Sequence, residues 1–145
     1  MKKENIFISY CTEDLELLKL TKDYINSFKR LNAIVVPQLK SNLSYNSEKV
    51  KNELDNSKYF LPILTSNSIN NQWVNQEVGY AIHKFKNHEI KPLVEKTIVN
   101  DLKGFITASN DLNYRFEKDK FAIKMKELVD DINGDLRPIR PGIIW

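Results

Sequence analysis

Several features that would point directly to a function are scarce in this chain of 145 residues. The single cysteine, Cys11, excludes an internal disulfide, so we expect a reducing, cytoplasmic environment. Only four glycines are present, and they form no glycine-rich phosphate loop. No apolar run approaches the length of a transmembrane helix, and the N-terminal residues lack the pattern of a secretory signal. The sequence therefore predicts a cytoplasmic protein without a membrane partner.

The charge balance and the spacing of the histidines also argue against two kinds of partner. The 22 basic and 19 acidic residues are interspersed and leave a net charge of +3, which is too balanced to argue for a nucleic-acid partner. The two histidines, His83 and His88, are spaced poorly for metal ligands on one helix. We therefore expect no metal and no nucleic acid. The length fits a single domain over residues 1–145.

Short apolar runs alternate with segments of helical periodicity along the chain. Five segments have the composition of strands: residues 6–10, 33–36, 59–65, 90–94 and 111–114. Five segments have the apolar spacing of helices: residues 12–28, 47–54, 71–88, 98–102 and 119–132. This alternation predicts an α/β fold of the flavodoxin-like, three-layer type. We expect a mainly parallel, five-stranded sheet of order 2-1-3-4-5 with helices on both faces.

Polar residues end the first and third predicted strands. Ser9, Tyr10 and Cys11 end the first strand, and Thr65 and Ser66 end the third. In the predicted strand order these two ends flank the point where the order reverses. Open α/β sheets bind ligands at the carboxyl ends of the strands beside such a point. The sequence therefore predicts a ligand site at this edge of the sheet.

A tryptophan and a glutamate begin the helix that follows the third strand. Trp73 and Glu77 are four positions apart and share one helical face. Val74, Val78 and Ala81 form a separate apolar stripe that can face the core. The helix N-terminus favours an ionised carboxylate, so we expect Glu77 to carry its charge. This carboxylate is the main candidate for chemistry.

Three motifs together resemble the Toll/interleukin-1 receptor (TIR) domain family: FISY at residues 7–10, LPILTS at residues 61–66 and WVNQE at residues 73–77. In the enzymatic branch of that family, a glutamate four positions after the tryptophan is essential for cleaving NAD⁺. Glu77 occupies that position. The resemblance therefore implies an NAD⁺ glycohydrolase or cyclase with Glu77 as its catalytic residue. NAD⁺ would be the substrate, and no bound cofactor is expected.

The chemistry explains why one carboxylate would suffice. Cleavage of the nicotinamide–ribose bond has an oxocarbenium-like transition state. Nicotinamide leaves as a neutral molecule and needs no general acid, so one ionised carboxylate can orient the ribose and stabilise the developing positive charge. Attack by water gives ADP-ribose, whereas attack by an adenine nitrogen or a ribose hydroxyl gives a cyclic ADP-ribose type of nucleotide. The sequence does not choose between these products.

Residues around the carboxylate are candidates for binding the substrate. An aromatic ring can offer a flat surface to nicotinamide or adenine, and hydroxyl groups at a strand end can donate to ribose or phosphate. The candidate substrate-binding residues are Ser9, Tyr10, Cys11, Gln38, Thr65, Ser66 and Trp73. The chain departs from the family in two loops. PQLKSN at residues 37–42 stands where the family often has an acid and glycines, and CTED at residues 11–14 stands where some NAD-cleaving members have basic residues.

Other functions stay open. A non-catalytic adaptor would bind other TIR domains through the loop at residues 37–46, and family enzymes are commonly switched on by self-association. A nucleotide-sensing module would bind NAD⁺ without cleaving it. The resemblance to stand-alone microbial TIR proteins also implies antiphage immune signalling, in which the nucleotide product activates a separate effector protein.

Each candidate residue also has an ordinary structural interpretation. Glu77 can be a solvated helix residue paired with Lys84, and Trp73 can be a lid over the edge of the core. Tyr10 and Cys11 can be packing residues. The enzymatic interpretation fails if the carboxyl group of Glu77 points into solvent, far from the end of the first strand.

Overall fold

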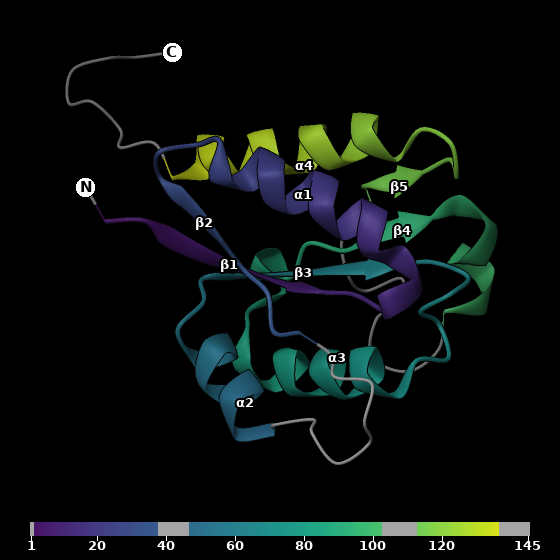
Figure 1. Ribbon diagram of the computed structural model, residues 1–145, viewed down its shortest axis with the longest axis horizontal. Helices are drawn as coiled ribbons and strands as arrows, with labels where there is room; N and C mark the ends of the chain where they lie inside the picture. The colour runs from purple at the N-terminus through teal and green to yellow at the C-terminus, as the bar shows by residue number, and fades with distance from the viewer. Residues whose placement is uncertain (1, 38–46, 103–112, 137–145) are drawn as a thin grey trace.

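The computed structural model describes residues 2–37, 47–102 and 113–136. Its centre is a five-stranded parallel sheet of order β2-β1-β3-β4-β5 (Figure 1). The strands are β1 (Glu4–Ser9), β2 (Leu31–Ile34), β3 (Tyr59–Leu64), β4 (Leu93–Glu95) and β5 (Arg115–Phe116). The predicted strand order is confirmed.

Two pairs of helices cover the two faces of the sheet (Figure 1). One layer consists of α1 (Leu15–Asn26) and α4 (Phe121–Asp135), and the other consists of α2 (Ser47–Asp55) and α3 (Gln72–Lys84). The described residues also include three short 3-10 helices: η1 (Thr12–Asp14), η2 (Asn87–Glu89) and η3 (Lys96–Asp101). The predicted flavodoxin-like, three-layer α/β class is therefore confirmed.

The alternation of side chains along β1 divides the core into two clusters. Ile6 and Ile8 pack on the side of α1 and α4, whereas Phe7 packs on the side of α2 and α3. The alternation continues beyond the strand, so Tyr10 joins the first cluster and Cys11 the second. At the end of β1, the neighbouring side chains of Tyr10 and Cys11 therefore lie on opposite faces of the sheet.

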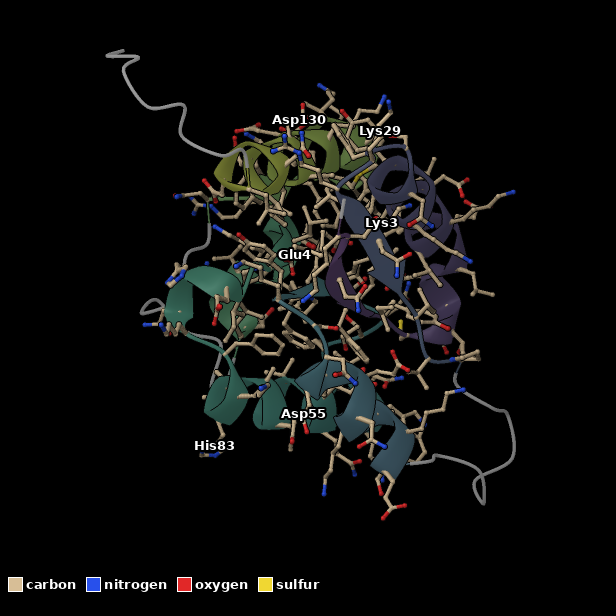
Figure 2. All side chains as sticks on the ribbon, turned by 90° about the vertical axis from the view of Figure 1, so that its left-hand side faces the viewer. Lys3, Glu4, Lys29, Asp55, His83 and Asp130 are labelled. Atoms are coloured by element: carbon tan, nitrogen blue, oxygen red, sulfur yellow. The ribbon has the colours of Figure 1, made fainter. Side chains whose placement is uncertain are left out.

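Figure 2 shows the amino edge of the sheet, where Glu4 begins β1 between the two helix layers. Lys29 and Asp130 lie in the layer of α1 and α4, and Asp55 and His83 lie in the layer of α2 and α3 (Figure 2). The strands run from this edge toward the opposite one (Figure 1). Tyr10, Cys11, Thr65 and Ser66, which follow the carboxyl ends of β1 and β3, therefore lie at that opposite edge.

Some element boundaries differ from the predicted ones. The helix predicted to run to residue 88 ends at Lys84, because Phe85 turns to extended backbone and stacks its ring on Phe60 at a centroid distance of 6.0 Å. β4 begins only after Pro92, which has no N–H group for the ladder. The last strand is Arg115–Phe116, where residues 111–114 were predicted. The predicted loop at residues 38–46 and the tail at residues 137–145 lie outside the described residues.

β2 forms one edge of the sheet, and its outward N–H groups have partners within the chain. The N–H of Leu31 donates to the carbonyl oxygen of Phe28 at 3.4 Å. The N–H of Ala33 donates to Oδ1 of Asn26 at 2.9 Å. Unpaired donors at a sheet edge favour the addition of a foreign strand. The end of α1 and the turn after it satisfy both of these donors.

Candidate active site

Glu77 lies in the second turn of α3, on the side of the helix that faces the sheet. The helix is capped by Asn71, whose Oδ1 accepts the N–H of Val74 at 3.0 Å. Val74 and Val78 flank Glu77 on the same helical side, and all three side chains are buried. The prediction that Glu77 and the apolar stripe occupy separate faces is wrong, because one side of the helix carries both. The carboxylate is therefore directed into the fold, and the residue is 4% exposed.

Ser9 connects β1 to this carboxylate. Its Oγ donates to Oε1 of Glu77 at 2.6 Å, and the serine is completely buried. This distance lies in the range of hydrogen bonds from a hydroxyl group to a charged oxygen. The end of the first strand and the start of α3 therefore meet, as the strand order predicted. A carboxyl group that faced solvent would have contradicted the enzymatic interpretation. The carboxyl group of Glu77 does not face solvent.

Burial controls the charge of Glu77. Removal of the carboxylate from water raises the pKa of Glu77 from 4.5 to about 7, and the hydrogen bond from Ser9 opposes this rise. Burial therefore opposes the preference of the helix N-terminus for the ionised form. Near neutral pH, the free protein therefore holds this carboxyl group as a mixture of its neutral and ionised forms.

Asp14 forms a second buried centre that the sequence did not reveal. Its Oδ2 accepts hydrogen bonds from Oγ1 of Thr65 at 2.6 Å and from Sγ of Cys11 at 3.1 Å. Its Oδ1 accepts a hydrogen bond from Nδ2 of Asn67 at 2.8 Å. In the sequence, Asp14 was only an acid at a helix start. The available signal was its position after β1, opposite hydroxyl and amide side chains that follow β3.

Thr65 and Cys11 both donate hydrogen bonds to Asp14. The hydroxyl hydrogen of Thr65 goes to Asp14, while its oxygen accepts the N–H of Asn67 at 3.1 Å. Burial and the neighbouring Asp14 carboxylate raise the pKa of Cys11, so its thiol stays protonated and is a poor nucleophile. Both side chains therefore have structural partners in the free protein. Ser66, next in the chain, is exposed.

The remaining candidates lie in different places. Tyr10 packs with Ile6 and Ile8 on the opposite side of the sheet from Glu77, so the structure does not bring these two candidates together. Trp73 is half-buried one helical turn before Glu77. Gln38 lies outside the described residues. Ser9, Thr65 and Cys11 are the predicted binding residues that the structure gathers around the buried carboxylates.

In the part of the chain that the structure describes, no group of three or more His, Cys, Asp or Glu side chains could hold a metal ion. Within residues 2–37, 47–102 and 113–136, no helix is both long and apolar enough to cross a membrane.

The fold and the site define an α/β protein with buried carboxylates where the strand order reverses. The family model of the TIR domain matches residues 6–129, and the chain therefore belongs to the TIR domain family. Among 23 matching solved chains is a metazoan TIR-STING receptor from C. gigas, with 18% identity and a TM-score of 0.58. The likeness covers 92% of this chain and 40% of the receptor chain, and at this identity it shows the fold. No curated protein matches the chain.

Proposed function

We propose that the protein is an NAD⁺ glycohydrolase or cyclase that breaks the bond between nicotinamide and ribose, with Glu77 as the catalytic carboxylate. The observation that carries this proposal is the contact between Ser9 and Glu77 at the reversal point of the sheet. Membership of the TIR domain family supports it, since some members cleave NAD⁺.

The geometry assigns different tasks to the two carboxylate oxygens. Ser9 fixes Oε1 through its hydrogen bond. We assign the other oxygen to the ribose of the substrate, where a negative charge stabilises the oxocarbenium-like transition state. Glu77 must then be ionised, and its pKa of about 7 makes the active form the minor one below neutral pH. Trp73, on the neighbouring turn, is the candidate aromatic surface for the nicotinamide or adenine ring.

Burial of the carboxylate means that access is part of the mechanism. Glu77 is 4% exposed, so the side chains that cover it must move before a ribose reaches it. TIR domains commonly self-associate or bind other TIR domains. We propose that self-association through the loop at residues 37–46 opens the site. That loop follows β2, which is the neighbour of β1 in the sheet, and therefore begins beside the end of the strand that carries Ser9.

The experiment compares nicotinamide release by the wild type, Glu77→Gln and Glu127→Gln over a range of protein concentrations. Glutamine keeps the size of the side chain and an oxygen for Ser9 but removes the charge, so we expect a loss of roughly 100-fold or more. Glu127 is exposed on α4, and its substitution should leave turnover unchanged. Release that survives in Glu77→Gln contradicts the catalytic assignment.

Mass identification of the product separates hydrolysis from cyclisation. ADP-ribose indicates attack by water, and a cyclic nucleotide indicates attack from within the substrate. We propose that this product acts on a separate effector protein in antiphage signalling, which the family resemblance supports. Addition of the purified product to candidate effectors tests that step. An effector that responds to the purified product no more than to NAD⁺ or buffer would contradict it.

A non-catalytic adaptor is the second candidate, and the burial of Glu77 favours it. A glutamate that is 4% exposed and held by Ser9 can serve the fold alone. Under this proposal, wild-type protein releases no nicotinamide at any concentration, and intact NAD⁺ is recovered. Substitution of Leu43, in the loop outside the described residues, would then abolish assembly measured by light scattering.

A further inference from the structure

Asp14 precedes α1 at the N-cap position but does not cap that helix. An aspartate at this position usually accepts N–H groups from the first helical turn. Here its oxygens accept Thr65 at 2.6 Å and Asn67 at 2.8 Å from the loop between β3 and α3, and Cys11 at 3.1 Å. The residue is 5% exposed, and burial of a carboxylate is unfavourable unless donors compensate for the lost water. The side chain therefore joins two chain segments and does not serve its own helix.

Hydrogen bonds lead from Asp14 to the start of α3 without interruption. Thr65, which donates to Asp14, also donates its N–H to Oγ of Ser68 at 2.8 Å. The carbonyl oxygen of Ser68 accepts the N–H of Asn71 at 2.9 Å. Asn71 in turn caps α3 through Val74. The position of the first turn of α3 is thus linked to Asp14 through a short, ordered loop.

Ser9 and Glu77, the pair on which the proposed function depends, lie on the same two chain segments. Ser9 lies on β1 just before Asp14, and Glu77 lies on α3 just after the loop. The segments are joined at two places, by Asp14 with Thr65 and by Ser9 with Glu77, each at 2.6 Å. We propose that Asp14 is a positioning residue, which holds the loop between β3 and α3 so that Glu77 meets Ser9. The effect on turnover rests on the proposed function, but the effect on Glu77 does not.

The test substitutes Asp14→Asn, which keeps the size of the side chain but removes a charged acceptor and adds an N–H₂ group beside donors. Asp131→Asn is the matched control, because Asp131 on α4 accepts the hydroxyl of Tyr114 at 2.6 Å, away from the loop. The carboxyl group of Glu77 is titrated by ¹³C NMR, and its signal is assigned by its loss in Glu77→Gln. We expect a midpoint near 7 in the wild type and in Asp131→Asn. In Asp14→Asn the midpoint should fall toward 4.5, because a displaced α3 admits water.

Turnover supplies the second measurement. For Asp14→Asn we expect kcat of nicotinamide release to fall roughly 100-fold with little change in KM, since misplacement of a catalytic group acts on the chemical step. Asp131→Asn should change neither constant. If the wild type releases no nicotinamide while Asp14→Asn still moves the Glu77 midpoint, the proposed function fails and the positioning role stands. If the wild type is active and Asp14→Asn behaves as Asp131→Asn does in both measurements, the positioning role is overturned.

A milder variant keeps the test decisive if Asp14→Asn does not fold. Asn67→Ala removes only the donor to Oδ1 of Asp14 and leaves the contact with Thr65 in place. Asn67 is exposed, so the core is not affected. We expect a smaller shift of the Glu77 midpoint in the same direction and a smaller fall in kcat. An unchanged midpoint together with an unchanged kcat would overturn the inference.

Discussion

Replacement of Glu77 by glutamine should change how the stability of the protein depends on pH. The folded state raises the pKa of this carboxyl group from 4.5 to about 7, so the native protein binds a proton more tightly than the unfolded chain does. The side chain therefore favours folding below about pH 4.5, and this contribution is lost as pH rises through about 7. Glutamine does not titrate, so the difference between the two proteins isolates the effect.

The magnitude follows from the two pKa values. Each pH unit between them corresponds to about 1.4 kcal/mol, and the whole interval therefore amounts to about 3 kcal/mol. Relative to the wild type, Glu77→Gln should gain about this much in free energy of unfolding between pH 4 and pH 8. The residue is 4% exposed, so screening by solvent is small.

Urea unfolding followed by circular dichroism, at intervals between pH 4 and pH 9, measures this difference. Subtraction of one curve from the other removes the contribution of every other titrating group. Glu127→Gln, at an exposed position on α4, is the control for the loss of a glutamate charge outside the core. A difference between Glu77→Gln and the wild type that stays within about 0.5 kcal/mol over the range would refute the argument that burial sets the charge of Glu77.

Further predictions concern the same region. In the active protein, kcat/KM for nicotinamide release should rise roughly tenfold per pH unit below 7 and level off above about pH 8, as measured over a pH series. Ser9→Ala removes the hydrogen bond that lowers the pKa of Glu77, so the midpoint of that profile should move to higher pH. Cys11 should resist iodoacetamide in the folded protein and react after unfolding in urea, because burial and Asp14 raise its pKa; mass spectrometry measures the adduct. Asn71→Ala removes the cap of α3 and should lower the free energy of unfolding by about 1 kcal/mol in urea titrations.

The strand order was predictable because apolar runs alternate with helical spacing, and chain connectivity then restricts the topology. The end of α3 was not predictable, since the apolar spacing continues through Phe85. The backbone becomes extended at Phe85, where the ring packs on Phe60, and the sequence does not reveal this contact. β5, Arg115–Phe116, is too short to produce a pattern. Boundaries set by a single tertiary contact or by two residues leave little trace in a sequence.

The candidate site, like the fold, was predictable only in part. The position of Glu77 was predictable from the tryptophan four residues before it and from the strand order. Its burial was not, because the partner Ser9 is 68 positions away and the apolar stripe appeared sufficient to fill the core-facing side. Asp14 was missed for a related reason. Its donors Thr65 and Asn67 lie in a loop whose folded shape the local sequence does not specify.

The edge of the sheet at β2 limits how copies of this chain can join. Both outward amides, those of Leu31 and Ala33, are already bound by Phe28 and Asn26. A second chain that approached this border as an extra strand would first have to displace them. Contacts between copies at this border would therefore have to depend on side chains and not on backbone pairing.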